Sequence, residues 1–376
     1  MTLKTRRIIY ISLIIFFIVA TPLILAYSLG YSYDLQNKKI VQTGGFYLRS
    51  YPSGAKIFIN DKQKNKTPRL ISRLLPKEYK VKILKDGFYP WEKQLKIDSR
   101  SVTEARNILL VAENPEIKII LENLSADFLL NRYFMKAEEL KKADQANQTA
   151  KNILKSNVFV LSGEQIFYLN PNSYLLYSSD ANGENKTQIS LSPLPKNDYK
   201  ITVAGTWILA LNNNGNLFIL NQQTRIFDLI GTNVKNAFFS PDAKKLLYFT
   251  ENEIWVRYLE KIQIQPYHES GKKELITRFS EKISSAIWYP EDNEHIIFVI
   301  ADTVKITELD GRDKRNTYDF FKAPGAFDAD SWSNPQLYYN TEKESLYFIN
   351  NNQLYSAQIK TAQTIIKPKT WYIFGK

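Results

Sequence analysis

A strand–turn–strand pattern recurs in the C-terminal half of the chain. Ser240-Pro241-Asp242 follows the strand-like run 234–239, and Tyr289-Pro290-Glu291 follows 283–288, so the two prolines lie 49 residues apart. Each motif is followed shortly by an apolar run. A period of 40–50 residues with about four short strands per unit is typical of β-propeller blades, which must stack because one blade cannot bury both faces of its sheet. We therefore predict propeller-like repeats over 153–376, with roughly five blades and a range of 5 to 7.

Weaker copies of the unit surround this pair. A degraded copy runs from Phe327 to Trp332 and on to the apolar run 345–349, and earlier copies lie at 157–180 and 201–221. Glycine-containing residue pairs that favour hairpin turns occur within this region at 182–183, 214–215 and 310–311. The repeats resemble those of the Tol-associated periplasmic protein and of WD40-like surface proteins. Four tryptophans near comparable repeat positions indicate a structural role, with a carbohydrate-binding rim as the alternative: Trp207, Trp255, Trp288 and Trp332.

An uncharged stretch from Ile8 to Tyr27 has the length of a transmembrane helix. It holds thirteen Ile, Leu, Phe and Val residues and follows three basic residues, and about 20 apolar residues are needed to cross a bilayer. The preceding basic residues predict a cytoplasmic N-terminus and an extracytoplasmic remainder. Tyr27, Tyr31 and Tyr33 then fall where an aromatic interfacial belt is expected.

A cleaved signal peptide is the alternative for this stretch. Ala26 and Ser28 are small residues of the kind found at cleavage sites, but the apolar core is longer than the usual 7–15 residues. Both alternatives place the bulk of the chain outside the cytoplasm. Cysteine is absent, so no disulfide and no thiolate metal site is expected.

The segment 46–98 alternates as half-buried strands do. Tyr79, Val81 and Ile83 share one face of a strand, while Lys80 and Lys82 share the other. Turns are predicted at 52–55, 61–66 and 86–87, where proline and glycine supply the required backbone angles.

This segment resembles the PEGA family of small β-sandwich modules found on bacterial and archaeal surface proteins. Two glycines usual in the family are replaced, one near Asn65 or Lys66 and one near Lys77 or Glu78, which affects turn geometry only. The resemblance implies interaction or spacing at the cell surface and no catalytic residue. The residues that carry it are Pro52, Ser53, Gly54 and Ala55 at the first turn, the run 57–61, Thr67 and Pro68, Leu74, Tyr79, and Gly87 and Phe88 before Trp91.

The excess of positive charge is concentrated next to the apolar stretch. Of the formal net charge of +12, residues 1–45 contribute +4 and residues 46–98 contribute +8, while 99–376 is balanced. One interpretation is binding to anionic envelope polymers or lipid headgroups, each basic group contributing about 1 kcal/mol near such a surface. The other is an ordinary solvated lysine-rich surface. Nucleic acid is not an expected partner, since this part is predicted to lie outside the cell and carries no known nucleic-acid-binding pattern.

The sequence offers few candidate catalytic or metal-ligating residues. His268 and His295 share no spacing with a nucleophile or metal ligand, and we interpret both as surface or turn residues. The run 180–184 resembles a calcium loop only loosely, and a plain turn is the simpler interpretation. Asp328 and Asp330 are candidate paired carboxylates of a glycoside hydrolase, although two acids in a loop are commonplace.

The sequence therefore predicts a mainly β, non-enzymatic, single-pass membrane protein with no cofactor and no metal. It contacts the membrane through 8–27, anionic envelope polymers or lipid headgroups through 46–98, and a protein or glycan through the propeller. The alternatives are an exported hydrolase of wall polymers and a purely structural stalk. The predicted domains are 1–30, cytoplasmic tip and transmembrane helix; 31–45, linker; 46–98, PEGA-like β-sandwich; 99–152, connecting segment with first propeller strands and a helical insert; and 153–376, propeller-like repeats.

Overall fold

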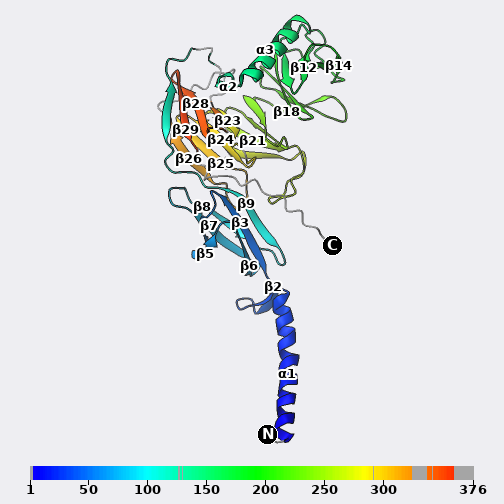
Figure 1. Ribbon diagram of the computed structural model, residues 1–376. Coiled ribbons are helices and arrows are strands. Elements are labelled where there is room, and N and C mark those ends of the chain that lie inside the picture. Colours follow the sequence, from blue (N-terminus) through cyan, green and yellow to red (C-terminus); the bar gives the residue numbers. More distant parts are fainter. Residues whose placement is uncertain are drawn as a thin grey trace. The chain divides into compact units, whose positions relative to one another are not determined.

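The computed structural model describes residues 3–125, 128, 130–290, 292–323, 337–340 and 342–359 (Figure 1). These residues form two compact units. The first contains the described residues up to 111 together with 310–316, and the second contains 112–309 and those from 317 onward.

The first unit begins with helix α1, Leu3–Ser28. Its apolar window has a mean hydropathy of 2.8 and none of it is buried in the protein. Pro22 lies inside the helix. Within the described residues, α1 is the one helix long and apolar enough to cross a membrane, and a helix of this kind serves either as an anchor or as a signal sequence.

The predicted linker 31–45 is not a simple connection. It holds a two-stranded antiparallel hairpin made of β1, Tyr31–Asp34, and β2, Lys39–Gln42. Gly44, which opens the next strand, is tightly enclosed, because an added Cβ would lie 2.5 Å from the Ile97 side chain and 2.6 Å from the Ser101 carbonyl oxygen.

A β-sandwich follows, built from two sheets that enclose one core. One sheet has the order β6-β3-β9 and the other β5-β4-β7-β8. Strand alternation places Phe46, Leu48, Ile57, Val81 and Ile83 in the core, all fully buried. The strands are β3, Gly44–Tyr51; β4, Lys56–Ile59; β5, Lys62–Lys66; β6, Arg69–Leu74; β7, Glu78–Leu84; β8, Trp91–Lys96; and β9, Val102–Leu109.

The sandwich differs from the sequence prediction in its end and in one connection. It extends beyond residue 98, because β9 pairs in parallel with β3; its residues 108 and 109 therefore belong to the sandwich and not to the propeller. The turn at 52–55 does not close a hairpin, since β3 and β4 lie in different sheets. It carries the chain from one sheet to the other.

The first unit also includes a segment from far along the chain. Residues 310–316, where a tight hairpin was predicted, instead form a longer loop between β25 and β26 and pack on the sandwich. The buried Lys93 amine donates to the carbonyl oxygens of Asp310 (2.8 Å), Arg312 (3.0 Å) and Lys314. The sequence gives no sign of this contact, because Lys93 lies more than 200 positions from its partners.

The second unit contains five four-stranded antiparallel sheets among its described residues, each formed mainly by consecutive strands. This is the strand order of a β-propeller, and it confirms the predicted fold class. The first four blades are β11 (Phe159–Ser162), β12 (Gln165–Leu169), β13 (Leu176–Asp180) and β14 (Thr187–Gln188); β15 (Tyr199–Ala204), β16 (Trp207–Asn212), β17 (Leu217–Leu220) and β18 (Phe227–Gly231); β19 (Asn236–Phe239), β20 (Lys245–Phe249), β21 (Glu253–Tyr258) and β22 (Lys273–Arg278); and β23 (Ile283–Trp288), β24 (His295–Ile300), β25 (Thr303–Glu308) and β26 (Thr317–Lys322).

The fifth blade joins the two ends of the unit. Its strands β27 (Leu337–Asn340), β28 (Ser345–Asn350) and β29 (Gln353–Gln358) are completed by β10 (Ile117–Leu121), which pairs antiparallel with β29. The sequence placed first propeller strands within 99–152 but did not show that one of them belongs to the last blade. Pairing the first strand with the last blade covers an edge that would otherwise expose unpaired backbone groups.

The faces of successive blades are buried against each other. Blades 1 and 2 share the core around Leu176 and Ile208, blades 2 and 3 that around Leu217 and Leu246, and blades 3 and 4 that around Val256. Blades 4 and 5 meet where the Phe321 and Phe348 rings lie 5.1 Å apart.

A helical insert covers the remaining faces of blades 5 and 1. Helix α2, Leu130–Tyr133, belongs to the core of Tyr347 and Leu354 in blade 5. Helix α3, Ala137–Asn152, packs Ala146 on Ile166 and Tyr168 of blade 1. The helical insert predicted within 99–152 is therefore a helix with one buried side, lying where the first and last blades would otherwise leave apolar faces open.

Candidate binding surface and buried polar network

The turn residues singled out in the sequence form a buried hydrogen-bonded corner of the sandwich. The Thr67 hydroxyl lies 2.6 Å from the Ser50 hydroxyl and accepts a hydrogen bond from the Ala55 N–H at 3.1 Å. The Ser50 hydroxyl also lies 2.7 Å from the Pro52 carbonyl oxygen, to which it donates. The Gly54 N–H donates to the Thr67 carbonyl oxygen at 2.8 Å. The corner is therefore structural.

The remaining motif residues also have structural positions. Ser53 is exposed and its carbonyl oxygen accepts a bond from Lys85. Pro68 is exposed beside the buried Thr67. Gly87 has φ of +81°, a left-handed angle that favours glycine, and Phe88 packs partly buried against the sandwich core.

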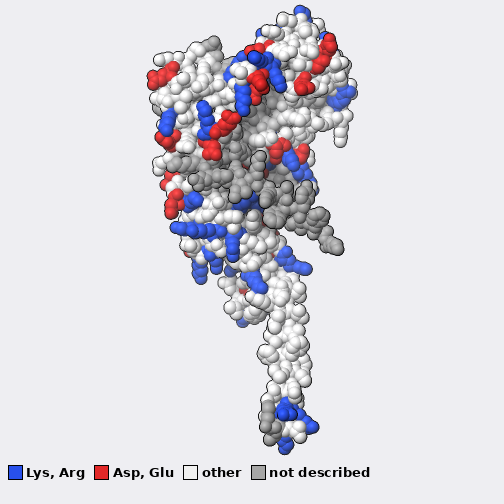
Figure 2. All heavy atoms as spheres, viewed as in Figure 1, with Lys and Arg blue, Asp and Glu red and all other residues white. Residues whose placement is uncertain are grey.

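The outer face of the β5-β4-β7-β8 sheet carries a cluster of lysines. Because Ile57 and Ile83 point into the core, their neighbours Lys56 and Lys82 point outward, and Lys66 lies directly opposite Lys56 across the strand pair. Figure 2 shows Lys and Arg side chains gathered over this domain. We call Lys56, Lys66 and Lys82 the lysine face.

Within residues 31–125, no acidic side chain forms an ion pair with the lysine face. Glu92 lies opposite Lys82 in the register, yet its ion pair is with Lys80 at 3.1 Å. Within residues 31–125, all of which the structure describes, no ion pair involves Lys56, Lys66 or Lys82. Like charges directly opposite on a sheet are unfavourable. A bound anion would remove that repulsion.

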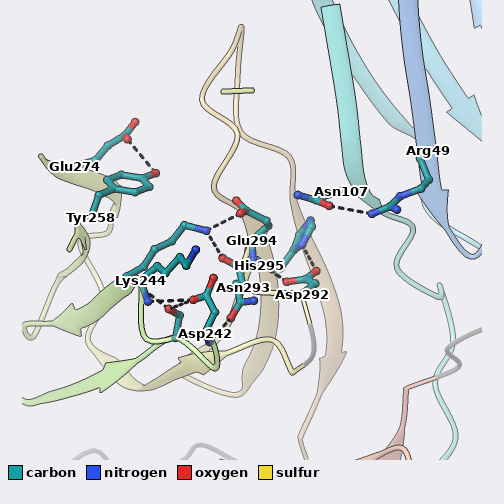
Figure 3. A network of polar contacts seen from close by, with 12 residues as sticks. Arg49, Asn107, Asp242, Lys244, Tyr258, Glu274, Asp292, Asn293, Glu294 and His295 are labelled. Atoms are coloured by element: carbon teal, nitrogen blue, oxygen red, sulfur yellow. Dashed lines mark hydrogen bonds and ion pairs between the residues drawn. The ribbon is translucent and has the colours of Figure 1, made fainter. Parts of the chain in front are cut away.

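A second set of charged groups lies inside the propeller, at the turns after the first strands of blades 3 and 4 (Figure 3). The Lys245 amine contacts a Glu294 carboxylate oxygen at 2.5 Å and donates to the Asn293 carbonyl oxygen at 2.9 Å. His295 Nδ1 lies 2.5 Å from an Asp292 carboxylate oxygen. The Asn293 amide oxygen accepts from the Asp242 N–H, which joins the two turns.

Burial governs the electrostatics of this network. Burial raises the pKa of Glu294, and the Lys245 charge offsets only part of that effect. Burial alone would lower the pKa of His295, but the charge of Asp292 and the hydrogen bond to it raise it overall. Lys245 and His295 are almost fully buried. The groups are engaged with one another, so the arrangement fixes the inter-blade turns.

The interpretation of His295 as a surface or turn residue is wrong, whereas His268 lies in the connection between β21 and β22 but is buried there. His295 is the buried first residue of β24, and the His268 ring stacks on Tyr258 with centroids 3.9 Å apart. The burial of His295 is not visible locally, since the residues directly before it are all polar. The prolines of the two repeated motifs do occupy equivalent places, each following the first strand of its blade.

Asp180, the first residue of the run that loosely resembles a calcium loop, is bonded to its own turn. Asp180 accepts hydrogen bonds from the N–H groups of Asn182 (3.0 Å) and Glu184 (2.9 Å) and from the Asn185 amide (3.0 Å). These bonds lower the pKa of Asp180, the one from Glu184 most. Asp180 therefore organises its own turn. Among the residues that the structure describes, no group of three or more His, Asp or Glu side chains is placed to hold a metal ion.

The tryptophans pack between blades, but at different strands. Trp207 begins the second strand of blade 2, Trp255 lies on the third strand of blade 3, and Trp288 ends the first strand of blade 4. The expectation of comparable positions is thus wrong, while the structural role agrees with their place in the inter-blade cores. Trp332, Asp328 and Asp330 lie outside the described residues.

Comparison with family models decides the identity of the sandwich. The PEGA domain model matches residues 43–111. Residues 43–111 form a PEGA domain. The match covers β3 to β9 and so includes the parallel strand that lay beyond the predicted boundary. PEGA domains are of an extracellular type, which makes this chain a candidate surface or binding protein.

Solved structures with propeller folds resemble a larger part of the chain. A gluconolactonase from Xanthomonas campestris is 12% identical over 54% of this chain and 72% of its own, with a TM-score of 0.31. The C-terminal WD40 domain of Sif2 is 11% identical over 52% and 54% (TM-score 0.35), and Hsv2 of Kluyveromyces lactis is 11% identical over 82% and 72% (TM-score 0.35). A search of curated proteins found no match. TM-scores this low do not support a fold assignment, so the propeller assignment depends on the strand order described above.

Sequence reasoning located the PEGA motif and the positive charge of the domain, but not the lysine face itself. The signal was present, since Lys56 and Lys82 alternate with buried isoleucines. What the sequence did not give is the register that sets Lys66 opposite Lys56.

Proposed function

We propose that this chain is a non-enzymatic, membrane-anchored envelope protein whose PEGA domain binds an anionic polymer. The N-terminus would lie in the cytoplasm and both folded units outside, as the basic residues before α1 favour. The observation that carries the proposal is the lysine face, three outward amines on adjacent strands that form no ion pair within residues 31–125. For the propeller we propose a protein or glycan partner, supported by the engagement of its described acid–base pairs with one another.

The test is binding of linear polyphosphate to the full chain in detergent micelles across a salt titration. The variant Lys56→Gln/Lys66→Gln/Lys82→Gln removes three charges from the lysine face. At about 1 kcal/mol for each amine, affinity should fall roughly a hundredfold, and the salt dependence should weaken.

The matched control removes the same charge from another surface. Lys141, Lys142 and Lys151 are exposed on α3 and take part in no ion pair among the described residues. The Gln variant of these three should bind polyphosphate as the unmodified chain does. Equal losses in both variants would mean that net charge alone attracts the polymer, and saturable binding by neither surface would favour a structural stalk.

Membrane insertion and orientation need their own test. Full-length protein should float with lipid vesicles, whereas a chain lacking 1–30 should not. Protease added to intact cells should digest the propeller, and protection that is lost only on lysis would contradict the proposed orientation.

A further inference from the structure

The hairpin β1–β2 has one apolar face that the described residues leave partly to largely exposed. The register pairs Tyr33 with Ile40 and Tyr31 with Gln42, so Tyr31, Tyr33 and Ile40 lie on the same face. Their exposed fractions are 38%, 54% and 71%, and Leu35 in the turn is 80% exposed. We call these four residues the hairpin apolar face.

The opposite side and the turn of the hairpin are polar. Ser32, Asp34 and Lys39 alternate with the apolar residues, next to a half-buried Val41. The Asp34 carboxylate accepts hydrogen bonds from the N–H of Gln36 (3.0 Å) and from the Asn37 side chain (2.8 Å). The turn is therefore built by local bonds, and Leu35 is held outward as part of a formed structure.

The hairpin is fixed directly beside the end of the apolar helix. The Gly30 N–H donates to the Tyr27 carbonyl oxygen at 3.1 Å, and both the N–H and the hydroxyl of Thr43 donate to the Gly30 carbonyl oxygen at 2.8 Å. Gly30 has φ of +82°, which lets the chain leave the helix and turn at once into β1. The Arg73 guanidinium lies 3.6 Å from the Tyr27 ring centroid, so the sandwich also contacts this end of α1.

An isolated two-stranded hairpin is at best marginally stable in water. It is stabilised when another apolar surface packs against its apolar face. Tyrosine places an apolar ring and a polar hydroxyl across a membrane–water boundary. The hairpin starts three residues after α1 ends, which is within the depth of the headgroup region. We infer that the hairpin apolar face lies in the outer interface of the bilayer, with Leu35 and Ile40 directed into lipid.

This inference rests on the proposed membrane anchor, and it gives the anchor a second, oriented contact. A helix by itself leaves the attached domain free to rotate about the helix axis. An interfacial hairpin bound at Gly30 and Thr43 would restrict that rotation, because its apolar face must point into lipid.

The absence of cysteine makes the test direct, since any introduced thiol is the only one. Full-length Ile40→Cys and Lys39→Cys proteins, labelled with an environment-sensitive fluorophore, are reconstituted in neutral phosphatidylcholine vesicles. These neighbours lie on opposite faces of β2. We expect blue-shifted emission and severalfold stronger quenching by spin-labelled lipid at position 40 than at position 39.

The pair Tyr33→Cys and Ser32→Cys repeats the comparison on β1 and guards against disruption by a single label. Lipid quenching confined to positions 33 and 40 supports the inference. Equal, water-like emission at all four positions in protein that floats with the vesicles overturns it and leaves the anchor intact. Blue-shifted emission without lipid quenching places a protein surface there and also overturns it. Failure to float overturns the anchor and this inference together.

Discussion

The buried ion pair of the propeller makes a quantitative prediction. Lys245→Met keeps the length of the side chain but removes the charge that faces Glu294 at 2.5 Å. A buried carboxylate left without its counter-charge typically costs 3–5 kcal/mol. Lys245 is 2% exposed, whereas a quarter of the Glu294 side chain reaches solvent, so we expect the lower end, about 3 kcal/mol.

For a unit of this size, 1 kcal/mol corresponds to about 2–4 °C, so the melting temperature should fall by about 6–12 °C. Thermal unfolding of the full chain in detergent, followed by tryptophan fluorescence, measures it. The control is Lys244→Met, whose exposed ion pair with Glu260 at 3.7 Å should contribute at most about 1 kcal/mol. Comparable losses in the two variants would refute the reasoning.

The pH dependence follows from the raised pKa of Glu294. The folded state retains this proton at pH values where the unfolded chain, with a value near 4.5, has lost it, so stability falls as pH rises through that window. Removing Lys245 raises the pKa further and extends the window upward. The difference between Lys245→Met and the unmodified chain should therefore be small near pH 4.5 and grow towards pH 8. The double variant Lys245→Met/Glu294→Gln should recover most of the loss.

Three further changes test the corner of the PEGA domain, its first strand and the buried histidine. Thr67→Val should cost about 1–3 kcal/mol in urea unfolding because it leaves the buried Ala55 N–H without its acceptor, whereas Thr67→Ser should cost less. Gly44→Ala should destabilise the same domain by about 1–3 kcal/mol, since its Cβ would lie 2.6 Å from backbone oxygen atoms; a neutral result would mean that the strand can shift. For His295→Gln, the stabilisation lost should be larger at pH 6 than at pH 9, because a histidine with a raised pKa contributes fully below about 6.5 and loses that contribution as pH rises through its folded value. A pH-independent melting difference would contradict this.

Local patterns in the sequence determined the types of element. An uncharged apolar run of about 20 residues predicted a helix, and α1 spans it. Alternation at 79–83 predicted β7, and the spacing of Pro241 and Pro290 predicted repeated blades. These signals are readable because side-chain periodicity follows directly from helix and strand geometry.

Tertiary structure decided which strands meet. β3 and β4 adjoin in sequence but lie in different sheets, and β9 returns to pair with β3. β10 precedes every other propeller strand, yet it completes the last blade. Strand partners depend on backbone hydrogen bonds between distant segments, and alternation shows only that a strand has a buried face.

The same division applies to the candidate sites. The sequence gave the excess of positive charge in 46–98, whereas the cross-strand register brought Lys66 opposite Lys56. Hydrophilic residues such as Lys93, Lys245 and His295 read locally as surface positions. Lys93 and Lys245 are buried because their partners, carbonyl oxygens for Lys93 and a carboxylate for Lys245, arrive from other turns of the fold. His295 is paired with Asp292 of its own turn. Burying a charge is tolerable only when such partners are in place.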